Sequence, residues 1–217
     1  MFLRALLIRA LLPFTWRHVR SVQASRLMRF SATETDSAWQ ILDAMRHVAA
    51  PATRVRMLQH ALEEVHHASE FARVSRALCP VAPRPPLAER EPLCGDDPQG
   101  VPRFLAYAHV GERDVFDQFD AYAAGIGEGD AQRVFRESKL DELGHVGLTW
   151  SLLVEATGEP GRARRMIWSA RFRRAWESWV RFSGGLGAVT SGILLAAGWA
   201  IATALLAIPA RRRLRTT

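Results

Sequence analysis

Two Glu-x-x-His pairs are the residues of this chain best suited by type and spacing to do chemistry. Glu64 precedes His67 and Glu142 precedes His145, in each case by three positions. Residues three apart lie on one face of an α-helix, so a carboxylate and an imidazole at this spacing can hold one metal ion from the same side. A single pair of this kind is weak evidence, because such short motifs also arise by chance. Two pairs in separate segments favour a shared role.

A further glutamate stands 30 positions before each pair. Glu34 precedes Glu64 by this distance, and Glu112 precedes Glu142 by the same distance. In a helical hairpin each helix rises about 1.5 Å per residue, so two residues equally far from the turn meet at one level. The expected turns lie about midway in both intervals. One Glu from each of two helices and a Glu-x-x-His from each of the other two form the ligand set of a dinuclear carboxylate site.

Apolar residues at helical spacing place these carboxylates inside the protein. The residues seven positions before and after each glutamate are Leu27 and Ile41, Met57 and Phe71, Leu105 and Phe119, and Phe135 and Thr149. Each glutamate therefore lies in the middle of a stripe that faces a core. Four carboxylates in one core cannot remain ionised without partners, because burying an unpaired charge is strongly unfavourable. They need protons or cations, and metal ions meet this need.

The apolar pattern predicts four helices and no strand. The helices are expected at residues 21–49, 52–78, 103 to about 125, and 130–157, with Asp130 as the N-cap of the last. Prolines at positions 51 and 80 limit the first two helices. A proline-rich stretch at 79–102 would join the two hairpins. Two hairpins joined by one long connection predict a four-helix bundle with a crossover.

The net charge of +7 is divided unevenly along the chain. Residues 1–33 sum to +6, residues 34–158 to −8 and residues 159–217 to +9. An acidic body between basic ends is a poor match to nucleic acid, because phosphate binding needs positive charge on the folded surface. We therefore expect no nucleic-acid partner, and we expect the basic ends to face a lipid bilayer.

The C-terminal part predicts a membrane anchor. Residues 182–210 carry no charge and are long enough for one transmembrane helix, with a buried core helix as the alternative. An Arg- and Trp-rich juxtamembrane segment at 158–181 and a basic tail at 211–217 flank them. Residues 1–20 predict a basic amphipathic helix lying on the bilayer, with a mitochondrial transit peptide as the alternative. We expect a single-pass membrane protein whose bundle, residues 21–157, is cytoplasmic and whose two cysteines are free.

Glu34, Glu64-x-x-His67, Glu112 and Asp141-Glu142-x-x-His145 resemble the ferritin-like di-iron carboxylate superfamily, which includes rubrerythrins, bacterioferritins and di-iron oxygenases. The resemblance covers residues of about 21–157. It implies an all-α, ferritin-like four-helix bundle that holds two Fe ions, with Mn as the alternative at one or both positions. It also implies that Glu34 and His67 serve one ion and Glu112 and His145 the other. Glu64 and Glu142 would bridge the two ions.

Several neighbouring residues are candidates for supporting roles. Asp141 and Glu63 each precede a ligand glutamate, and each is expected either to accept the free ring N–H of a ligand histidine or to remain on a solvated face. Tyr122 is expected to face inward, either as core packing or as a redox-active residue. His60 and His66 are expected to point away from the axis of the bundle. No catalytic residue beyond the metal ligands is predicted.

The resemblance and the expected anchor together imply a membrane-anchored oxidoreductase. It would use O2 to hydroxylate or desaturate a hydrophobic substrate such as a lipid or a quinone. Electrons would come from a separate donor, because no rubredoxin-like cysteine set accompanies the bundle. One alternative is an iron-handling or peroxide-scavenging protein of the rubrerythrin and bacterioferritin type. A second is a non-catalytic membrane adaptor that has the same fold, and a homodimer is compatible with all three.

Overall fold

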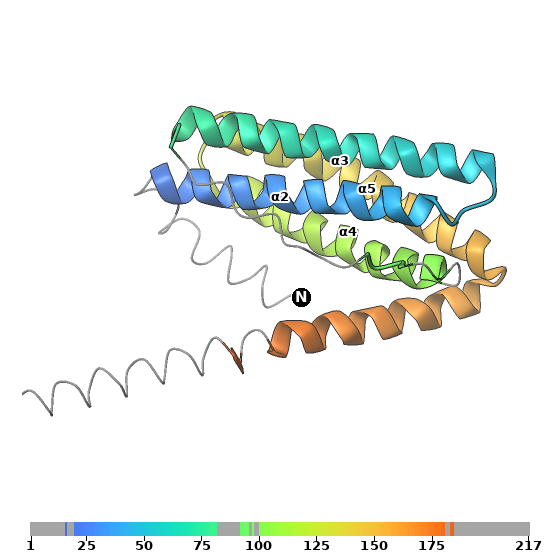
Figure 1. Ribbon diagram of the computed structural model, residues 1–217. Helices are drawn as coiled ribbons and strands as arrows, with labels where there is room; N and C mark the ends of the chain where they lie inside the picture. The colour runs from blue at the N-terminus through green and yellow to red at the C-terminus, as the bar shows by residue number, and fades with distance from the viewer. Residues whose placement is uncertain are drawn as a thin grey trace, which may run out of the picture. The chain divides into compact units, whose positions relative to one another are not determined.

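The computed structural model describes residue 16 and residues 20–81, 92–95, 97, 100–180 and 183–184. These residues form helices and turns and contain no strand, which confirms the all-α prediction for the described part of the chain. Four long helices are present (Figure 1): α2 (Arg20–Met45), α3 (Pro51–Leu78), α4 (Gly100–Gly125) and α5 (Asp130–Thr157). A further helical stretch covers residues 160–180.

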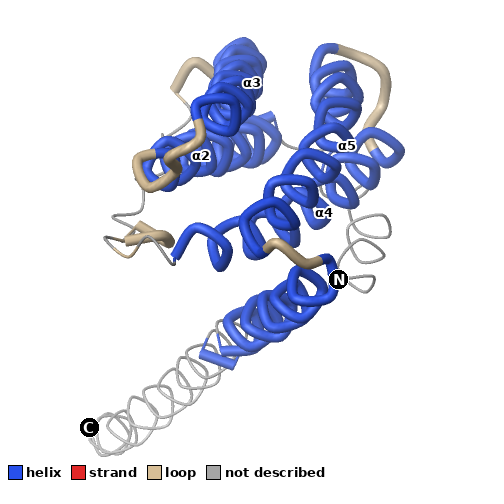
Figure 2. Tube along the Cα trace, turned by 90° about the vertical axis from the view of Figure 1, so that its right-hand side faces the viewer, coloured by secondary structure: helices blue, strands red, loops and turns tan. Residues whose placement is uncertain are grey.

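The four helices are arranged as two hairpins. Helix α2 packs along α3, and α4 packs along α5 (Figure 2). The hairpins meet mainly where α3 contacts α5, and α2 touches α4 more sparsely. Short turns link the helices within each hairpin, whereas the chain between residues 79 and 99 links the two hairpins. This arrangement is a helical bundle in which all four helices can direct side chains toward one axis.

The ends of the helices follow from local sequence. Helix α3 begins at Pro51, because a proline in the first turn loses no helical hydrogen bond. Helix α5 ends at Gly158, whose φ of 69° is the left-handed conformation that glycine adopts readily. Asp130 belongs to the first turn of α5, and the residue that caps the helix is Gly129. The prediction that Asp130 is the N-cap is therefore wrong by one residue.

Helix α2 ends four residues earlier than the sequence pattern indicates. Three tight turns follow Met45, in which the backbone N–H groups of Arg46, His47 and Val48 each donate to the carbonyl three residues earlier. These turns bring the chain round to Pro51. The residue before a proline is disfavoured in the helical conformation, and Ala50 is accordingly extended. Pro51 thus restricts the backbone conformation of the residue before it.

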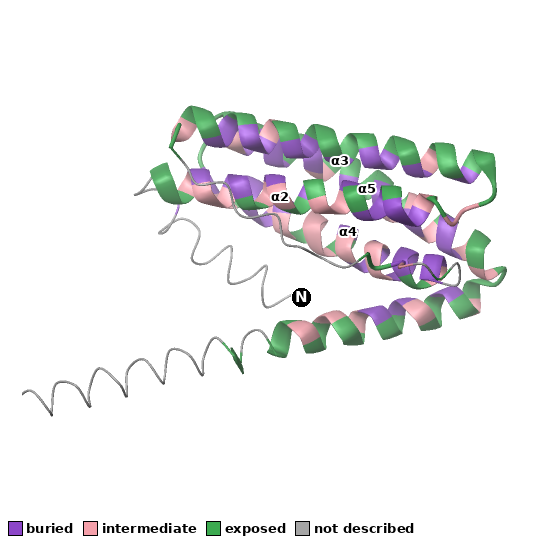
Figure 3. Cartoon of the chain, in the orientation of Figure 1, coloured by how far each residue is buried: buried purple, intermediate pink, exposed green. Residues whose placement is uncertain are grey.

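Two apolar clusters fill the two ends of the bundle. The aromatic cluster contains Leu27, Phe71, Phe119, Tyr122 and Phe135, with Phe30 and Trp16 packed into it. The aliphatic cluster, at the end near the α2–α3 turn, is built around Ile41, Met57, Leu105, Val110 and Leu153. Buried positions form continuous inward faces on all four helices (Figure 3). The predicted glutamates lie between the two clusters. Glu34, Glu64 and Glu112 are each seven residues from a member of both clusters, and Glu142 is seven residues from Phe135 of the aromatic cluster.

The segment after α5 begins on the aliphatic cluster. Ala163, Ile167 and Ala170 are buried and belong to that cluster. The predicted juxtamembrane segment, residues 158–181, is thus in its first half part of the folded core. The predicted membrane span at 182–210 lies outside the described residues, apart from positions 183 and 184. Among the helices that the structure describes, none has the length and apolar character needed to cross a bilayer.

The aromatic cluster should carry much of the stability of the bundle. Phe71 is fully buried and lies 5.1–5.5 Å, centroid to centroid, from Phe30, Phe119 and Phe135. We expect Phe71→Ala to lower the free energy of unfolding by about 3–5 kcal/mol, because it opens a cavity that the rings cannot fill. Leu62→Ala on the exposed face of α3 should change it by no more than about 0.5 kcal/mol. Urea titration followed by circular dichroism measures both, and equal effects would contradict this role.

Candidate metal centre

The six predicted ligands come together in the middle of the bundle. Helix α2 contributes one glutamate, α4 contributes one, and α3 and α5 each contribute one Glu-x-x-His pair. The residues are Glu34, Glu64, His67, Glu112, Glu142 and His145, and none is more than 5% exposed. Each helical hairpin thus brings two residues that are 30 positions apart in the chain to the same height along the bundle. The four helices each supply part of one polar layer between two apolar clusters.

The donor atoms form two groups that share a residue. Glu34, Glu64, His67 and Glu142 make one group, and His60, Glu64, Glu112 and His145 make the other. Within each group, one ligand atom from every residue lies within 4.8 Å of the others. This spacing is short enough for a single ion to contact all four atoms after small side-chain adjustments. The pairing of Glu34 with His67 and of Glu112 with His145 is the one that the resemblance implies.

Each ligand histidine is held by a carboxylate from the opposite hairpin. The Nε2 atom of His67 lies 3.0 Å from Oδ2 of Asp141, and the Nε2 atom of His145 lies 2.8 Å from Oε2 of Glu63. A carboxylate at this position accepts an N–H, which leaves the Nδ1 atom of the ring as the donor to a metal. The structure therefore places Asp141 and Glu63 where the sequence analysis expects supporting carboxylates, although each remains half exposed.

The inward-facing atoms lack hydrogen-bond partners. Among the described residues, the buried atoms without one include Nδ1 of His67 and of His145, Oε1 of Glu34, and both carboxylate oxygens of Glu64 and Glu142. The Nδ1 atom of His67 is 3.6 Å from Oε1 of Glu142. The Nδ1 atom of His145 is 3.0 Å from Oε1 of Glu64 and 3.6 Å from Oε2 of Glu142. Buried polar atoms in proteins are almost always paired. Unpaired atoms that face one another across a few ångströms indicate a place for a cation.

His60 also belongs to the cluster, although the sequence pattern predicts that it points away from the axis. It is buried, and its Nε2 atom lies 3.2 Å from Oε1 of Glu64 and 3.5 Å from Oε1 of Glu112. The expectation that it points away from the axis is wrong. His60 precedes Glu64 by four residues, and this spacing puts the two residues on one helical face. The Glu-x-x-His pattern identifies His67, which follows Glu64 by three residues. His60, four residues before Glu64, has an equally suitable helical spacing and could have been identified in the same way.

His66 and Tyr122 lie outside the cluster. His66 is exposed, as expected. Tyr122 faces inward but packs among rings, stacked on Phe135 at 4.8 Å and edge-on to Phe30 at 5.1 Å. It follows Glu112 by ten residues on α4, which corresponds to about 15 Å along the helix. The contacts of Tyr122 therefore fit core packing at the aromatic end of the bundle.

Burial shifts the acid–base behaviour of the cluster. It raises the pKa of Glu34 and of Glu142 well above the ordinary carboxyl value of 4.5, and neighbouring carboxylates add to the effect. It raises the pKa of Glu112 in the same direction. Burial also opposes the charge on Glu64, but contacts with the His145 and His60 imidazoles outweigh it and hold the pKa of Glu64 well below its usual range. Burial disfavours the charge on His145 too, yet Glu142 and Glu64 raise its pKa to about 11.

Without cations, the cluster therefore balances its charge with protons. Metal ions would replace them, because carboxylate ligands bind in the ionised form and imidazole binds in the neutral form. Four glutamates supply four negative charges, which two divalent ions neutralise. Histidine adds ligand atoms without changing this balance. The buried Glu and His residues can thus hold metal ions, and the charge of the donor set fits two divalent ones.

Two hollows on the α3–α5 face adjoin the cluster. The larger has a volume of about 420 Å³, and its lining includes His60, Glu63, Asp141, Gly144 and His145. The smaller, of about 30 Å³, is lined by His67 and Ser138 among others. Each hollow therefore reaches the outer side of a histidine of the cluster. Their rims are formed largely by polar and charged side chains.

No protein-family model, curated protein or solved structure matches the chain.

The pH dependence of stability should differ between the metal-free and the metal-bound protein. The raised pKa values of Glu34, Glu142 and His145 mean that the folded state binds protons more tightly than the unfolded chain. Their contribution to stability is complete below the unfolded pKa values and is lost as pH rises through the folded ones. Glu64, whose pKa is lowered, acts in the opposite direction but is one group against several.

We therefore expect the Tm of the metal-free protein to fall as pH rises from about 5 to about 9. Zn(II) should raise the Tm more at about pH 8 than at about pH 6, because ion binding then displaces fewer protons. Thermal unfolding with and without Zn(II) across this range measures both effects. A Tm gain from Zn(II) that is equal at both pH values, or larger at the lower one, would contradict the proton–metal exchange.

Proposed function

We propose that this protein is a ferritin-like, dinuclear metal oxidoreductase in which two iron ions occupy the cluster between α2, α3, α4 and α5. The observation that carries the proposal is the set of buried, unpartnered carboxylate oxygens and imidazole nitrogens that face one another in the middle of the bundle. A bundle that needed these residues only for packing would be more stable with apolar side chains in their place. Bound ions offset the cost of burying them.

The chemistry of the donor set supports iron. Oxygen and imidazole nitrogen ligands suit Fe(II) and Mn(II), whereas no cysteine belongs to either ligand group. Both cysteines are free thiols, and Cys94 is buried in the aliphatic cluster. Iron held by these ligands would supply electron-transfer and oxygen chemistry, which no side chain of the cluster supplies by itself. The contribution of the protein is to hold the ions and to orient the His67 and His145 rings through Asp141 and Glu63.

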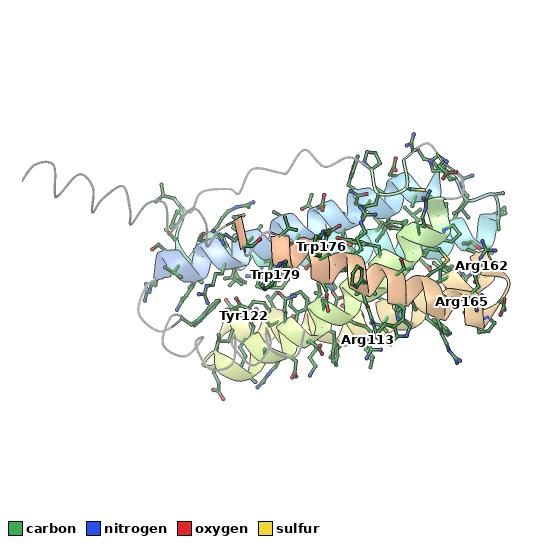
Figure 4. The ribbon with its side chains drawn as sticks, turned by 90° about the horizontal axis from the view of Figure 1, so that it is seen from below. Arg113, Tyr122, Arg162, Arg165, Trp176 and Trp179 are labelled. Atoms are coloured by element: carbon green, nitrogen blue, oxygen red, sulfur yellow. The ribbon has the colours of Figure 1, made fainter. Side chains whose placement is uncertain are left out.

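The first candidate for the reaction is O2-dependent oxidation of a hydrophobic substrate such as a lipid or a quinone, at a membrane. Helical residues 160–180 support a lipid-facing role. Phe172 and Trp176 are four residues apart, which puts them on one face of the helix, and both side chains are exposed. Trp176 and Trp179 project from the segment that begins at residue 171 (Figure 4). Aromatic rings interspersed with arginines are typical of helices at a membrane–water interface.

A second candidate, iron handling or peroxide scavenging, is favoured by the hollow of about 420 Å³ on the α3–α5 face. Its lining combines the polar side chains of Arg56, Gln59, Glu63 and Asp141 with His60, His145 and the apolar Leu140 and Leu148. The polar side chains among them suit hydrated ions or hydrogen peroxide. The half-exposed side chains of Glu63 and Asp141 also line the hollow, and carboxylate groups attract divalent cations.

Metal content tests the dinuclear centre directly. We expect the purified full chain to hold about two iron ions, and Glu142→Ala to lose most of them, because this carboxylate faces both His67 and His145. Glu137→Ala removes an exposed carboxylate from the same helix and should leave the metal content unchanged. Elemental analysis after anaerobic loading and desalting gives the numbers. Equal metal content in both variants would exclude the centre.

Oxygen consumption distinguishes the two candidate reactions. If the protein oxidises an organic substrate, Fe(II) oxidation should stop after about two equivalents per chain and resume when a reductant is added. A lipid extract or a quinone should stimulate the resumed consumption. If the protein handles iron, oxidation should continue over tens of equivalents, and if it scavenges peroxide, hydrogen peroxide should oxidise the centre faster than O2 does. Stopped-flow titration of Fe(II) in detergent, with O2 recorded in parallel, resolves these outcomes.

A further inference from the structure

His60 breaks the symmetry between the two hairpins. The ligands of the second hairpin repeat those of the first after 78 positions, and the pairs are Glu34 and Glu112, Glu64 and Glu142, and His67 and His145. The supporting carboxylates Glu63 and Asp141 obey the same offset. The residue 78 positions after His60 is Ser138, which is also buried. The first hairpin therefore has an imidazole at this position, and the second has a buried hydroxyl group.

The surroundings of His60 are those of a ligand. Its side chain is 3% exposed, and its Nε2 atom lies between the carboxylates of Glu64 and Glu112 without a hydrogen-bond partner. Its ring centroid is 3.9 Å from that of His145, so the two imidazoles approach the same place. An imidazole nitrogen buried beside carboxylate oxygens must either donate a proton to them or share a cation with them. The absence of hydrogen-bond geometry favours the cation.

We propose, on the basis of the dinuclear function proposed above, that His60 is a seventh ligand, through Nε2, and that the two metal positions are chemically unequal. The ion beside Glu112 has two imidazoles and two carboxylates, from His60, His145, Glu64 and Glu112. The ion beside Glu34 has one imidazole and three carboxylates, from His67, Glu34, Glu64 and Glu142. Glu64 belongs to both groups, so the difference between the positions comes from His60 and Glu142.

This inequality assigns a metal preference to each position. Imidazole-rich sites favour iron and zinc, whereas carboxylate-rich sites accept manganese and magnesium more readily. The Glu112 position binds iron or zinc first and more tightly. The Glu34 position is the one at which manganese replaces iron. A protein supplied with both metals therefore assembles a mixed Fe–Mn centre with a defined order rather than a random mixture.

A crystal structure of the full chain loaded with Zn(II) in detergent tests the coordination. We expect Nε2 of His60 within about 2.0–2.1 Å of the ion beside Glu112, as in other zinc–histidine bonds. If both positions are occupied and His60 remains more than about 3 Å from either ion, the seventh ligand is excluded and the dinuclear function stands. If neither position holds Zn(II), the proposed function itself fails.

Loading the protein with equal amounts of Fe(II) and Mn(II) tests the preference. Anomalous scattering at the two absorption edges should place iron beside Glu112 and manganese beside Glu34. In His60→Ala this order should disappear. The affinity of the tighter Zn(II) site should fall by about 10–100-fold or more, because losing even a residue that only supports a ligand costs about this much. Ser138→Ala, which removes the equivalent side chain of the other hairpin, should retain both the order and the affinity.

Thermal unfolding of each metal-free variant shows whether it has folded. If His60→Ala does not fold, the crystal structure and the mixed-metal loading of the unaltered chain decide whether His60 is a ligand. Equal occupancy of both metals at the two positions of the unaltered chain, or an unchanged Zn(II) titration in a folded His60→Ala, would overturn the proposal.

Discussion

The burial of four carboxylates in one layer of the bundle is the constraint on which the rest of the structure depends. Glu34, Glu64, Glu112 and Glu142 would repel one another and lose their hydration if all were ionised without cations. The fold tolerates this layer because two apolar clusters, one aromatic and one aliphatic, supply stability on either side of it. The arrangement separates the tasks of the core. Its ends hold the helices together, and its middle contains the candidate metal ligands.

The same constraint accounts for the supporting residues. A histidine that donates Nδ1 to a metal must have its Nε2 proton accepted elsewhere, or a second buried polar atom is left unpaired. Asp141 on α5 satisfies His67 on α3, and Glu63 on α3 satisfies His145 on α5. These two contacts cross between the hairpins, so the ligand histidines also help to join them. Because each supporting carboxylate is half exposed, it retains its charge and lies where a cation would approach from solvent.

The acid–base behaviour of the cluster connects the fold to its proposed chemistry. Raised pKa values at three of the glutamates and at His145, together with the lowered one at Glu64, describe a site that holds protons when it lacks ions. Protons at such a site reduce the repulsion among the carboxylates in the absence of ions. The hollow on the α3–α5 face is lined by His60 and His145 and so adjoins this layer.

The sequence by itself determined the helices and the candidate ligands, because both depend on spacing along one chain. Helical periodicity predicted the bounds of α3 and α5 to within a residue. The interval of 30 residues predicted that Glu34 lies beside Glu64 and Glu112 beside Glu142. The early end of α2 and the capping residue of α5 were set by local turns that periodicity does not report. Only the tertiary structure decided which hairpin supports which histidine, because Glu63 and Asp141 act across the α3–α5 contact. It also decided that His60 belongs to the cluster, since the depth of a side chain depends on how closely neighbouring helices pack around it.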